Sequence, residues 1–298
     1  MTYKPYLSRY PDYEYYDLLK TIVGQGIISP SPQGIDCLTY LNHTMRFELS
    51  NGFPMITQRS LKSFWRKPIA ELLVFMRGGR TQEDLEAAGC DWWSQWTSLE
   101  KTSKRGLSEG DIGPGSYGPA FHDFPMPNGE TFDQISNLVQ TIIDRPNDRR
   151  ALVVPWIPYL VAKNTKIDPQ VTIAPCHGTI YVRILGGQLH LTMVQRSGDV
   201  PVGVPSNMIQ YAALTLMLAQ VTGYSAASYS HHILDAHIYI DQLKHVDVLL
   251  RRTPKRLPTV QLSDEGRQIT DIFAFTPDHF VLSDYHPDPS IIGIPVAT

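Results

Sequence analysis

Cysteine is scarce in this sequence, and long apolar runs are absent. The three cysteines, Cys37, Cys90 and Cys176, are too few and odd in number for a disulfide framework, and they suit a reducing compartment. No stretch approaches the roughly 18 apolar residues of a membrane span. The N-terminal segment also lacks the apolar centre of a signal peptide. These absences argue against a disulfide-rich secreted domain and a membrane protein, and they predict a soluble cytoplasmic protein.

A strong charge imbalance is lacking as well. The formal net charge is −3 and no long basic run occurs, so we do not expect duplex nucleic acid as a partner. A nucleotide-sized anion can still bind, because a few well-placed arginines suffice. The ten histidines form no ligand-spaced cluster with the cysteines, so we expect no metal site.

What the sequence does contain is enough apolar material for a large core. The chain has 298 residues, of which 42% are hydrophobic, and its prolines and glycines are spread throughout. No repeat, low-complexity segment or linker divides it. We therefore predict a single domain over residues 1–298, which is large for one domain but allowed.

Apolar periodicity predicts a mixture of helices and strands. Two alternating runs, 179–185 and 188–195, are separated by Gly186 and Gly187, which indicates a β-hairpin with a two-residue turn. The segment 208–221 is apolar nearly all round, so it should be a buried central helix. Further helices are expected at 13–23, 69–76 and 132–143, strands at 37–49, 151–156 and 229–240 and in the C-terminal third, and irregular loops at 89–123. The predicted class is α+β, with a mostly antiparallel or mixed sheet packed by helices.

Cys176 is the first candidate for chemistry, because it stands in the motif Ala-Pro-Cys-His just before a predicted strand. A nucleophilic cysteine needs a lowered pKa, and a nearby arginine supplies this by favouring the thiolate. Arg149, Arg150 and Arg196 are the candidates for that arginine. A buried structural cysteine is the alternative, since sequence alone does not bring these side chains together.

The same arginines flank predicted strands: Arg149 and Arg150 precede one, and Arg196 and Ser197 follow another. Guanidinium groups and a hydroxyl are the donors that a phosphate monoester needs, although solvated strand ends explain either pair alone.

Glu71 lies inside an apolar helix, where an unpaired carboxylate is costly. It either faces a partner cation or is a site carboxylate with a raised pKa that positions water or moves protons.

Other side chains suit a flat heterocycle joined to a sugar. His237 and Tyr239 are two apart on a predicted strand, so they share a face and can hold one hydroxyl group. The amide of Asn207 offers a donor and an acceptor to a pyrimidine edge, or it is a helix N-cap or first-turn residue. Trp92, Trp93 and Trp96 can stack on a heterocycle. Core packing is the alternative for the aromatic residues and the histidine.

Together these residues resemble the thymidylate synthase family over nearly the whole chain. The strongest stretch begins at Pro175 and ends at Tyr239. The matching motifs are Met45-Arg46-Phe47, Gly52-Phe53-Pro54, Glu71-Leu72-Leu73, Trp93-x-x-Trp96, Gly113-Pro114, Tyr117-Gly118, Asp148-Arg149-Arg150, Pro175-Cys176-His177, Gln195-Arg196-Ser197-Gly198-Asp199, Gly203-Val204-Pro205-Ser206-Asn207, Asp235-Ala236-His237-Ile238-Tyr239 and Pro295-Val296-Ala297. Many short motifs in the family's order and spacing carry the resemblance.

The resemblance implies a homodimer of α+β fold that acts on dUMP, with 5,10-methylenetetrahydrofolate as cosubstrate. Cys176 would be the thiolate that adds to C6 of the uracil, and Asn207 would read the base. The other catalytic residues would be Glu71, Tyr117 and Asp199. Six residues of the same chain would hold the nucleotide: Gln195, Arg196, Ser197, Asn207, His237 and Tyr239. Arg149 and Arg150 would contact it from the other subunit. The folate would contact Trp93, Ile173, Asp199, Gly203, Ser206 and Ala297.

The chain departs from the family pattern around the phosphate and the folate. The family's Asp-Arg-Thr loop, which supplies a phosphate-binding arginine, reads Ser-Pro-Gln around Pro32. The phenylalanine before the base-reading asparagine is Ser206. The family pattern has glycine before Asp-Ala-His, where this chain has Leu234. It has an Asn-His pair after the strand, where this chain has Asp241-Gln242. The core chemistry is retained, whereas the folate side and part of the phosphate site have changed.

These departures bear on the product. In the family, elimination of the folate leaves an exocyclic methylene on the base, which takes hydride to become methyl or water to become hydroxymethyl. Ser206 opens space and adds a hydroxyl near the folate, so we expect a dUMP hydroxymethylase of the kind some phages use to make modified DNA, working then in the host cytoplasm. The alternatives are an ordinary thymidylate synthase, a cytidylate or ribonucleotide enzyme, and an inactive relative that binds nucleotide or RNA. Asn207 argues against cytosine, and Ser197 favours a deoxyribose.

Overall fold

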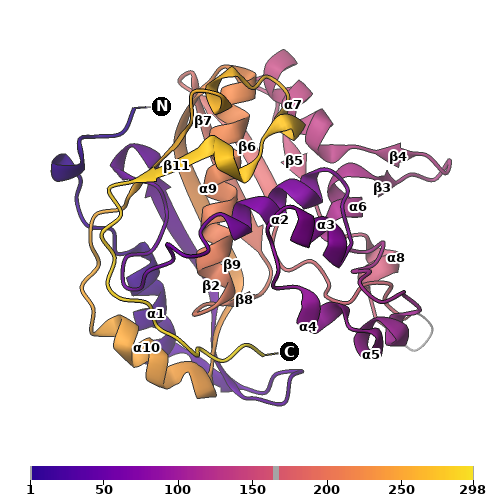
Figure 1. Cartoon of the computed structure of the whole chain (residues 1–298), viewed down its shortest axis with the longest axis horizontal. Coiled ribbons are helices and arrows are strands. Elements are labelled where there is room, and N and C mark those ends of the chain that lie inside the picture. Colours follow the sequence, from indigo (N-terminus) through magenta and orange to yellow (C-terminus); the bar gives the residue numbers. More distant parts are fainter. Residues whose placement is uncertain (1, 164–167, 298) are drawn as a thin grey trace.

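A mixed β-sheet forms the centre of the molecule (Figure 1). The computed structural model describes residues 2–163 and 168–297. The sheet has seven strands, six of them in the order β1-β2-β9-β7-β6-β5, with β8 paired to β9. Their bounds are β1 Ile27–Ser29, β2 Cys37–Glu48, β5 Leu152–Val153, β6 Thr179–Leu185, β7 Gln188–Gln195, β8 Gly198–Asp199 and β9 Ser225–Tyr239. β9 runs parallel to β7 and β8 and all other pairs are antiparallel, so the predicted α+β class with a mixed sheet is confirmed.

The hairpin of β6 and β7 forms at the predicted residues. Gly186 and Gly187 both have positive φ, 57° and 74°, as a two-residue turn between twisted strands requires. Leu189, Leu191 and Met193 are buried on one face of β7, and the residues that alternate with them are exposed or half-exposed. The alternation therefore fixes which face of β7 meets the core.

Helix α9, Gly203–Thr222, lies against the buried face of the sheet and is itself buried over most of its length (Figure 1). It packs on β7 and β9 on one side and on α2 and α7 on the other, which explains why its sequence is apolar nearly all round. The other helices are α1 Glu14–Gln25, α2 Lys67–Met76, α3 Gln82–Ala87, α4 Ser94–Thr97, α5 Leu99–Thr102, α6 Tyr117–His122, α7 Gln134–Asp144, α8 Pro158–Val161 and α10 Leu243–Leu250.

Three expectations from the sequence are wrong in detail. The region 89–123 is not only loop, because it holds the short helices α4, α5 and α6. The strand expected at 151–156 is reduced to β5, which pairs only with the start of β6. Asn207 is neither an N-cap nor a first-turn residue, because α9 begins four residues earlier, with Val202 as its N-cap. Asn207 lies in the second turn and faces inward.

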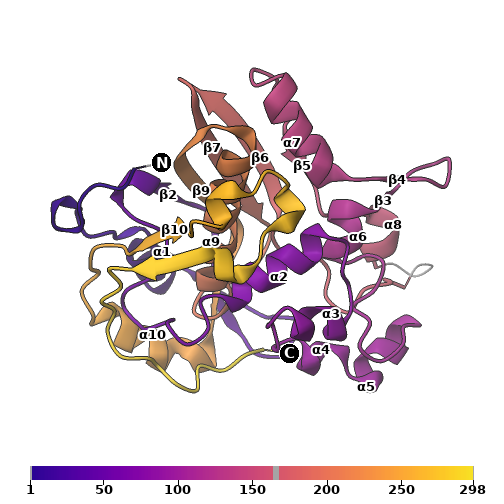
Figure 2. The ribbon, with the colours of Figure 1, turned by 45° about the horizontal axis from the view of Figure 1, so that its top comes forward.

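The C-terminal part of the chain wraps around this core. Strands β10, Thr259–Leu262, and β11, Phe280–Ser283, form a separate antiparallel pair. A second separate pair, β3, Phe124–Pro125, and β4, Thr131–Phe132, lies earlier in the chain. The last residues then run across the molecule and end beside α4 in both views (Figures 1 and 2). None of the described helices is long and apolar enough to cross a membrane.

Candidate functional site

Two adjoining cavities open where β7, β8 and β9 end. The first has a volume of about 690 Å³ and the second about 620 Å³. Five residues line both of them, so they form one continuous site: Trp96, Ile173, Cys176, Ser197 and Asp199. The short helix α4, which the sequence did not predict, and the turn before it supply the tryptophans of this site, Trp92, Trp93 and Trp96.

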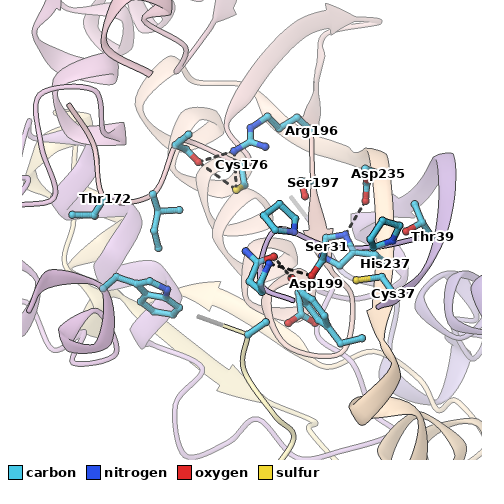
Figure 3. A pocket seen from close by; sticks show the side chains of 18 of the residues that line it. Ser31, Cys37, Thr39, Thr172, Cys176, Arg196, Ser197, Asp199, Asp235 and His237 are labelled. Carbon is cyan, nitrogen blue, oxygen red and sulfur yellow. Dashed lines mark hydrogen bonds and ion pairs between the residues drawn. The ribbon is translucent and has the colours of Figure 1, made fainter. Parts of the chain in front are cut away.

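Cys176 sits in the loop before β6, and Arg196 lies against it (Figure 3). Nη2 of Arg196 is 3.3 Å from Sγ, and the guanidinium also donates to the carbonyls of Ala174 and Pro175 at 2.9 and 2.8 Å. The main-chain N–H of Cys176 donates to the hydroxyl of Tyr117 at 2.7 Å. Burial raises the pKa of the Cys176 thiol, and the positive charge of Arg196 opposes that rise.

Glu71 lies inside the second cavity's wall, on α2, and is only 6% exposed. Its Oε1 accepts hydrogen bonds from the indoles of Trp92 and Trp93, and its Oε2 accepts one from the amide of Gln210. Burial raises the pKa of the Glu71 carboxyl, while these three N–H donors counteract the rise. Of the two interpretations of Glu71, the partner cation has no support in the described contacts, whereas a carboxylate of the site agrees with them.

Asn207 faces the same cavity and belongs to a set of buried amides. Its Oδ1 accepts from Gln195 at 3.1 Å, and its Nδ2 donates to Gln210 at 2.9 Å. Each of these amide groups therefore has a defined partner, and part of the Asn207 amide remains available to the cavity.

The first cavity carries the histidine and tyrosine that β9 places on one face. The rings of His237 and Tyr239 lie 5.3 Å apart, and Asp235 holds Nδ1 of His237 at 2.8 Å (Figure 3). The Tyr239 hydroxyl reaches Oε1 of Gln33 at 3.3 Å, in the loop before β2. One hydroxyl-bearing group of a ligand can contact both rings from this cavity.

Asp199 stands between the two cavities, at the end of β8. The amide of Gln242 donates to both of its oxygens at 3.1 Å, and the same amide donates to the carbonyl of Pro295 in the C-terminal tail at 2.9 Å. Burial raises the pKa of Asp199 to about 6, against the effect of Gln242. The tail contributes Ile294 and Val296 to the second cavity, so Gln242 ties the carboxylate to the segment that covers the site.

The family model described as Thymidylate synthase matches residues 13–297. The chain belongs to the thymidylate synthase family. Family membership confirms the resemblance that the motifs carry, and with it the coarse activity: folate-dependent transfer of one carbon to C5 of dUMP, with methylenetetrahydrofolate as cosubstrate.

Most of the residues predicted from the sequence line this thymidylate synthase site. Arg196, His237, Tyr239 and Ala297 line the first cavity, and Glu71, Trp93, Tyr117, Gln195, Gly203, Ser206 and Asn207 line the second, while Cys176, Ile173, Ser197 and Asp199 line both. The structure brings together residues as distant in sequence as Glu71 and Gln210. Their individual roles remain predictions that follow from the family.

Arg149 and Arg150 are the exception, because neither lines the two cavities. They follow α7 on the surface, where Arg150 pairs with Asp148 at 3.1 Å and is 83% exposed in its side chain. Neither is among the groups that shift the pKa of Cys176, so Arg196 alone fills that predicted role within the chain.

The altered phosphate loop offers no cation of its own. Ser31, Pro32 and Gln33 line the first cavity where the family's loop would contribute an arginine. The cations on the wall of this cavity, besides Arg196, come from the short helical segment after Trp96: Lys101, Lys104 and Arg105. The positive charge on the described wall of this cavity therefore lies on these three residues and Arg196.

Sequence reasoning gave no function to Gln210, and it noted Gln242 only as a departure from the family pattern. Gln210 follows Asn207 by three residues, so both lie on one face of the helix. A second polar residue on that face of an apolar helix could have been predicted to belong to the site. Gln242 follows the His-x-Tyr strand directly, but its partner Asp199 and the tail are distant in sequence. Only the fold shows that these two glutamines hold the site's two carboxylates.

Replacing Arg196 with methionine should make Cys176 less reactive at neutral pH. Loss of the adjacent cation destabilises the thiolate, so the thiol pKa rises further. A rise of one unit would slow alkylation at pH 7 about tenfold. Measuring the alkylation rate of Cys176 against pH by peptide mass spectrometry checks this. An unchanged midpoint of the pH curve would mean that Arg196 does not act on the thiolate.

Proposed function

We propose that this chain is a dUMP hydroxymethylase, which uses methylenetetrahydrofolate and water to convert dUMP into 5-hydroxymethyl-dUMP. The observation that carries the proposal is Ser206, a half-buried residue of α9 that lines the second cavity beside Asn207. The family pattern has phenylalanine at this position. A small hydroxyl there leaves room for water and offers it a hydrogen bond.

The reaction can be written with the residues in these positions. Cys176 Sγ adds to C6 of the uracil, so that C5 becomes nucleophilic and attacks the folate methylene carbon. Loss of the C5 proton and elimination of tetrahydrofolate leave an exocyclic methylene. Water adds its oxygen to that carbon and releases a proton, and the thiolate then leaves C6 as the ring double bond re-forms. The sum is dUMP, methylenetetrahydrofolate and water in, and 5-hydroxymethyl-dUMP and tetrahydrofolate out.

Polar residues around the second cavity fit the proton transfers that this sequence needs. Glu71 and the hydroxyl of Tyr117 both line the cavity, and Tyr117 contacts the main chain of Cys176. A carboxylate held by three donors can order a water for addition to the methylene or take up the proton that the water releases. Asn207 would hold the base while these steps proceed.

Thymidylate synthase itself is the second candidate, and one observation favours it. Trp92, Trp93 and Trp96 line the second cavity together with Ile291, Ile294 and Val296 of the tail. Such an apolar wall excludes water and keeps the reduced folate close enough to give hydride. The product would then be dTMP, and the folate would leave as dihydrofolate.

A spectrophotometric assay separates the two candidates, because dihydrofolate absorbs in the near ultraviolet where methylenetetrahydrofolate does not. We expect dUMP consumption without dihydrofolate formation. Dihydrofolate equal in amount to the dUMP consumed would overturn the proposal in favour of thymidylate synthase.

Replacing Ser206 with phenylalanine should shift the product towards dTMP. The larger side chain fills the space proposed for water and gives the folate ring an apolar contact. We expect the share of dTMP to rise at least severalfold, measured by chromatography of the nucleotides. Ser206→Ala is the matched control, since it removes the hydroxyl without filling the space. Identical product ratios in wild type and Ser206→Phe would contradict the role given to this position.

Folate binding should weaken as the pH falls through about 6. Asp199 accepts hydrogen bonds best as a carboxylate, and burial raises its pKa to about 6. Replacing Gln242 with leucine removes the donor to Asp199, so the pKa of the Asp199 carboxyl should rise. The KM for folate should then begin to increase at a higher pH than in the wild type. The KM for folate, measured from pH 5 to 8 in both proteins, checks the sign. A lower threshold in the variant would contradict this account.

We further propose that the chain acts as a homodimer in which Arg149 and Arg150 contact the phosphate bound in the partner's site. Their surface position, outside both cavities of their own chain, supports the proposal. A phosphate monoester carries nearly two charges, and guanidinium groups bind such an anion with paired hydrogen bonds.

A further inference from the structure

A line of hydrogen-bonded side chains runs along the wall of the second cavity. It joins Gln195 to Asn207, Asn207 to Gln210, and Gln210 to Glu71. All four side chains are nearly inaccessible, with exposed fractions of 3%, 6%, 0% and 6% in that order. Gln195, Asn207 and Glu71 also line the cavity, whereas Gln210 lies behind it. A buried amide can keep only the orientation in which every donor meets an acceptor.

One end of this line has a fixed polarity. Nε2 of Gln195 donates to the main-chain carbonyl of Ser197 at 3.0 Å, and a carbonyl can only accept. The atom of Gln195 that faces Ser197 is therefore the nitrogen, and its second hydrogen points to Oδ1 of Asn207. On its other side, Oε1 of Gln195 lies 2.7 Å from Nε2 of His231, which must donate. The amide of Gln195 is thus held from three sides.

The other end has the same polarity for an independent reason. As a carboxylate, Glu71 can only accept hydrogen bonds, and its Oε1 accepts from two indole N–H groups. Its remaining oxygen takes the N–H of Gln210, so Oε1 of Gln210 is left to accept from Nδ2 of Asn207. A 180° turn of the Asn207 amide would set nitrogen against nitrogen at Gln195 and oxygen against oxygen at Gln210. Both neighbours therefore hold Asn207 in one orientation.

The orientation matters because it decides which base edge fits. One N–H of Asn207 and one lone pair of its Oδ1 remain for a ligand, in a fixed spatial order. Uracil presents N3–H as donor beside O4 as acceptor, whereas cytosine presents N3 as acceptor beside N4–H as donor. The two bases need opposite orientations of the same amide.

We propose that Gln210 is a positioning residue with two functions: it locks the Asn207 amide in the orientation that accepts uracil and rejects cytosine, and it holds Glu71 in place for the reaction. The inference rests on the proposed function, because it assumes that Asn207 reads the base of dUMP. Gln210 touches neither substrate, since it lies behind the cavity wall. It acts through the oxygen that it offers Asn207 and the N–H that it offers Glu71.

Two substitutions separate these functions. Gln210→Met keeps the length of the side chain but removes both hydrogen bonds, so the Asn207 orientation rests on Gln195 alone. We expect the preference for dUMP over dCMP, measured as the ratio of Kd values by calorimetry, to fall about tenfold, which is the effect of one buried hydrogen bond. Gln210→Glu keeps an oxygen facing Asn207 but sets a second carboxyl against Glu71. It should keep the dUMP preference within about twofold and lower kcat at least about tenfold.

Thr215→Val is the matched control. Thr215 is fully buried on the same helix and donates to the carbonyl of Tyr211 at 2.7 Å, outside the line of amides. It should change neither the base preference nor kcat by more than about twofold. Each of the three variants loses at least one buried hydrogen bond. The thermal unfolding midpoint of each variant measures the effect of that loss on stability.

The outcomes are distinct. If wild type binds dUMP and releases tritium from its C5, and Gln210→Met loses base preference while Gln210→Glu keeps it, the inference holds. If wild type works but both variants keep the wild-type preference, or both lose it equally, Gln210 does not set the orientation and the inference is wrong. If wild type neither binds dUMP nor labilises its C5, the proposed function fails instead, whatever the variants do.

Discussion

Replacing Cys176 with serine should abolish release of tritium from C5 of dUMP. The labilisation of C5 requires a covalent bond at C6, and Cys176 is the thiol that the site places beside the Arg196 guanidinium. A serine hydroxyl in the same position has a far higher pKa, and one arginine cannot make it an alkoxide at neutral pH. We expect a loss of at least about a thousandfold in both tritium release and product formation.

The same variant should still bind dUMP within a few-fold of wild type. Arg196, Ser197, His237 and Tyr239 line the first cavity independently of the thiol, so the nucleotide keeps its contacts. Calorimetry with dUMP alone measures this. Intact binding with lost tritium release would locate the defect in chemistry rather than in folding.

Cys90→Ala is the control for general loss of a cysteine. Cys90 is fully buried in the core and lines neither cavity. Its removal should cost stability and leave tritium release unchanged within about twofold. If Cys176→Ser retained more than about a hundredth of the wild-type release, a thiolate at this position could not be the nucleophile. Absence of release in wild type would instead favour a relative that only binds nucleotide.

The second large effect concerns the two surface arginines. Arg149→Ala with Arg150→Ala should raise the KM for dUMP about a hundredfold or more, because each guanidinium bound to a phosphate contributes roughly 1.5–3 kcal/mol. Within its own chain the pair lies on the surface, and Arg150 contacts only Asp148 among the ion pairs described. A loss of this size would have no explanation if each chain worked alone.

Mixing this double variant with Cys176→Ser should restore activity if the arginines act in the partner's site. A mixed dimer has one site that combines an intact Cys176 with the intact arginines of the other subunit. Random exchange makes half of the dimers mixed, each with one working site of two, so recovery should approach about a quarter of wild type. Native mass spectrometry verifies that mixed dimers form. Mixed dimers without recovered activity would contradict action across the interface.

The sequence was sufficient for those parts of the fold that depend on local pattern. Gly186 and Gly187 dictate the turn of the β6–β7 hairpin, and the alternation of Leu189 and Leu191 dictates its buried face. The apolar character of α9 likewise predicts its burial. Helices α4 to α6 were missed because such short helices gain little from propensity and depend on tertiary contacts, as the hydrogen bond from Trp93 to Glu71 illustrates.

The site was predictable only as a collection of parts. The motifs name Cys176, Arg196 and Glu71, but the contacts that tune them join residues far apart in the chain. No function could be predicted for Gln210 or Gln242 from the sequence, because a buried glutamine has no sequence pattern that shows which residues it bonds. Arg149 and Arg150 were predicted from a motif, but the phosphate that they are proposed to bind lies in another subunit, so contacts within one chain do not test their function.

The central claim is tested most directly by mass spectrometry of the nucleotide that purified protein makes from dUMP and methylenetetrahydrofolate. The account predicts a product heavier than dUMP by one CH₂O, because water captures the methylene in a cavity opened at Ser206. A product heavier by one CH₂ would contradict it. That result would mean that hydride captured the methylene, that the chain is a thymidylate synthase, and that the space beside Ser206 does not admit water during the reaction.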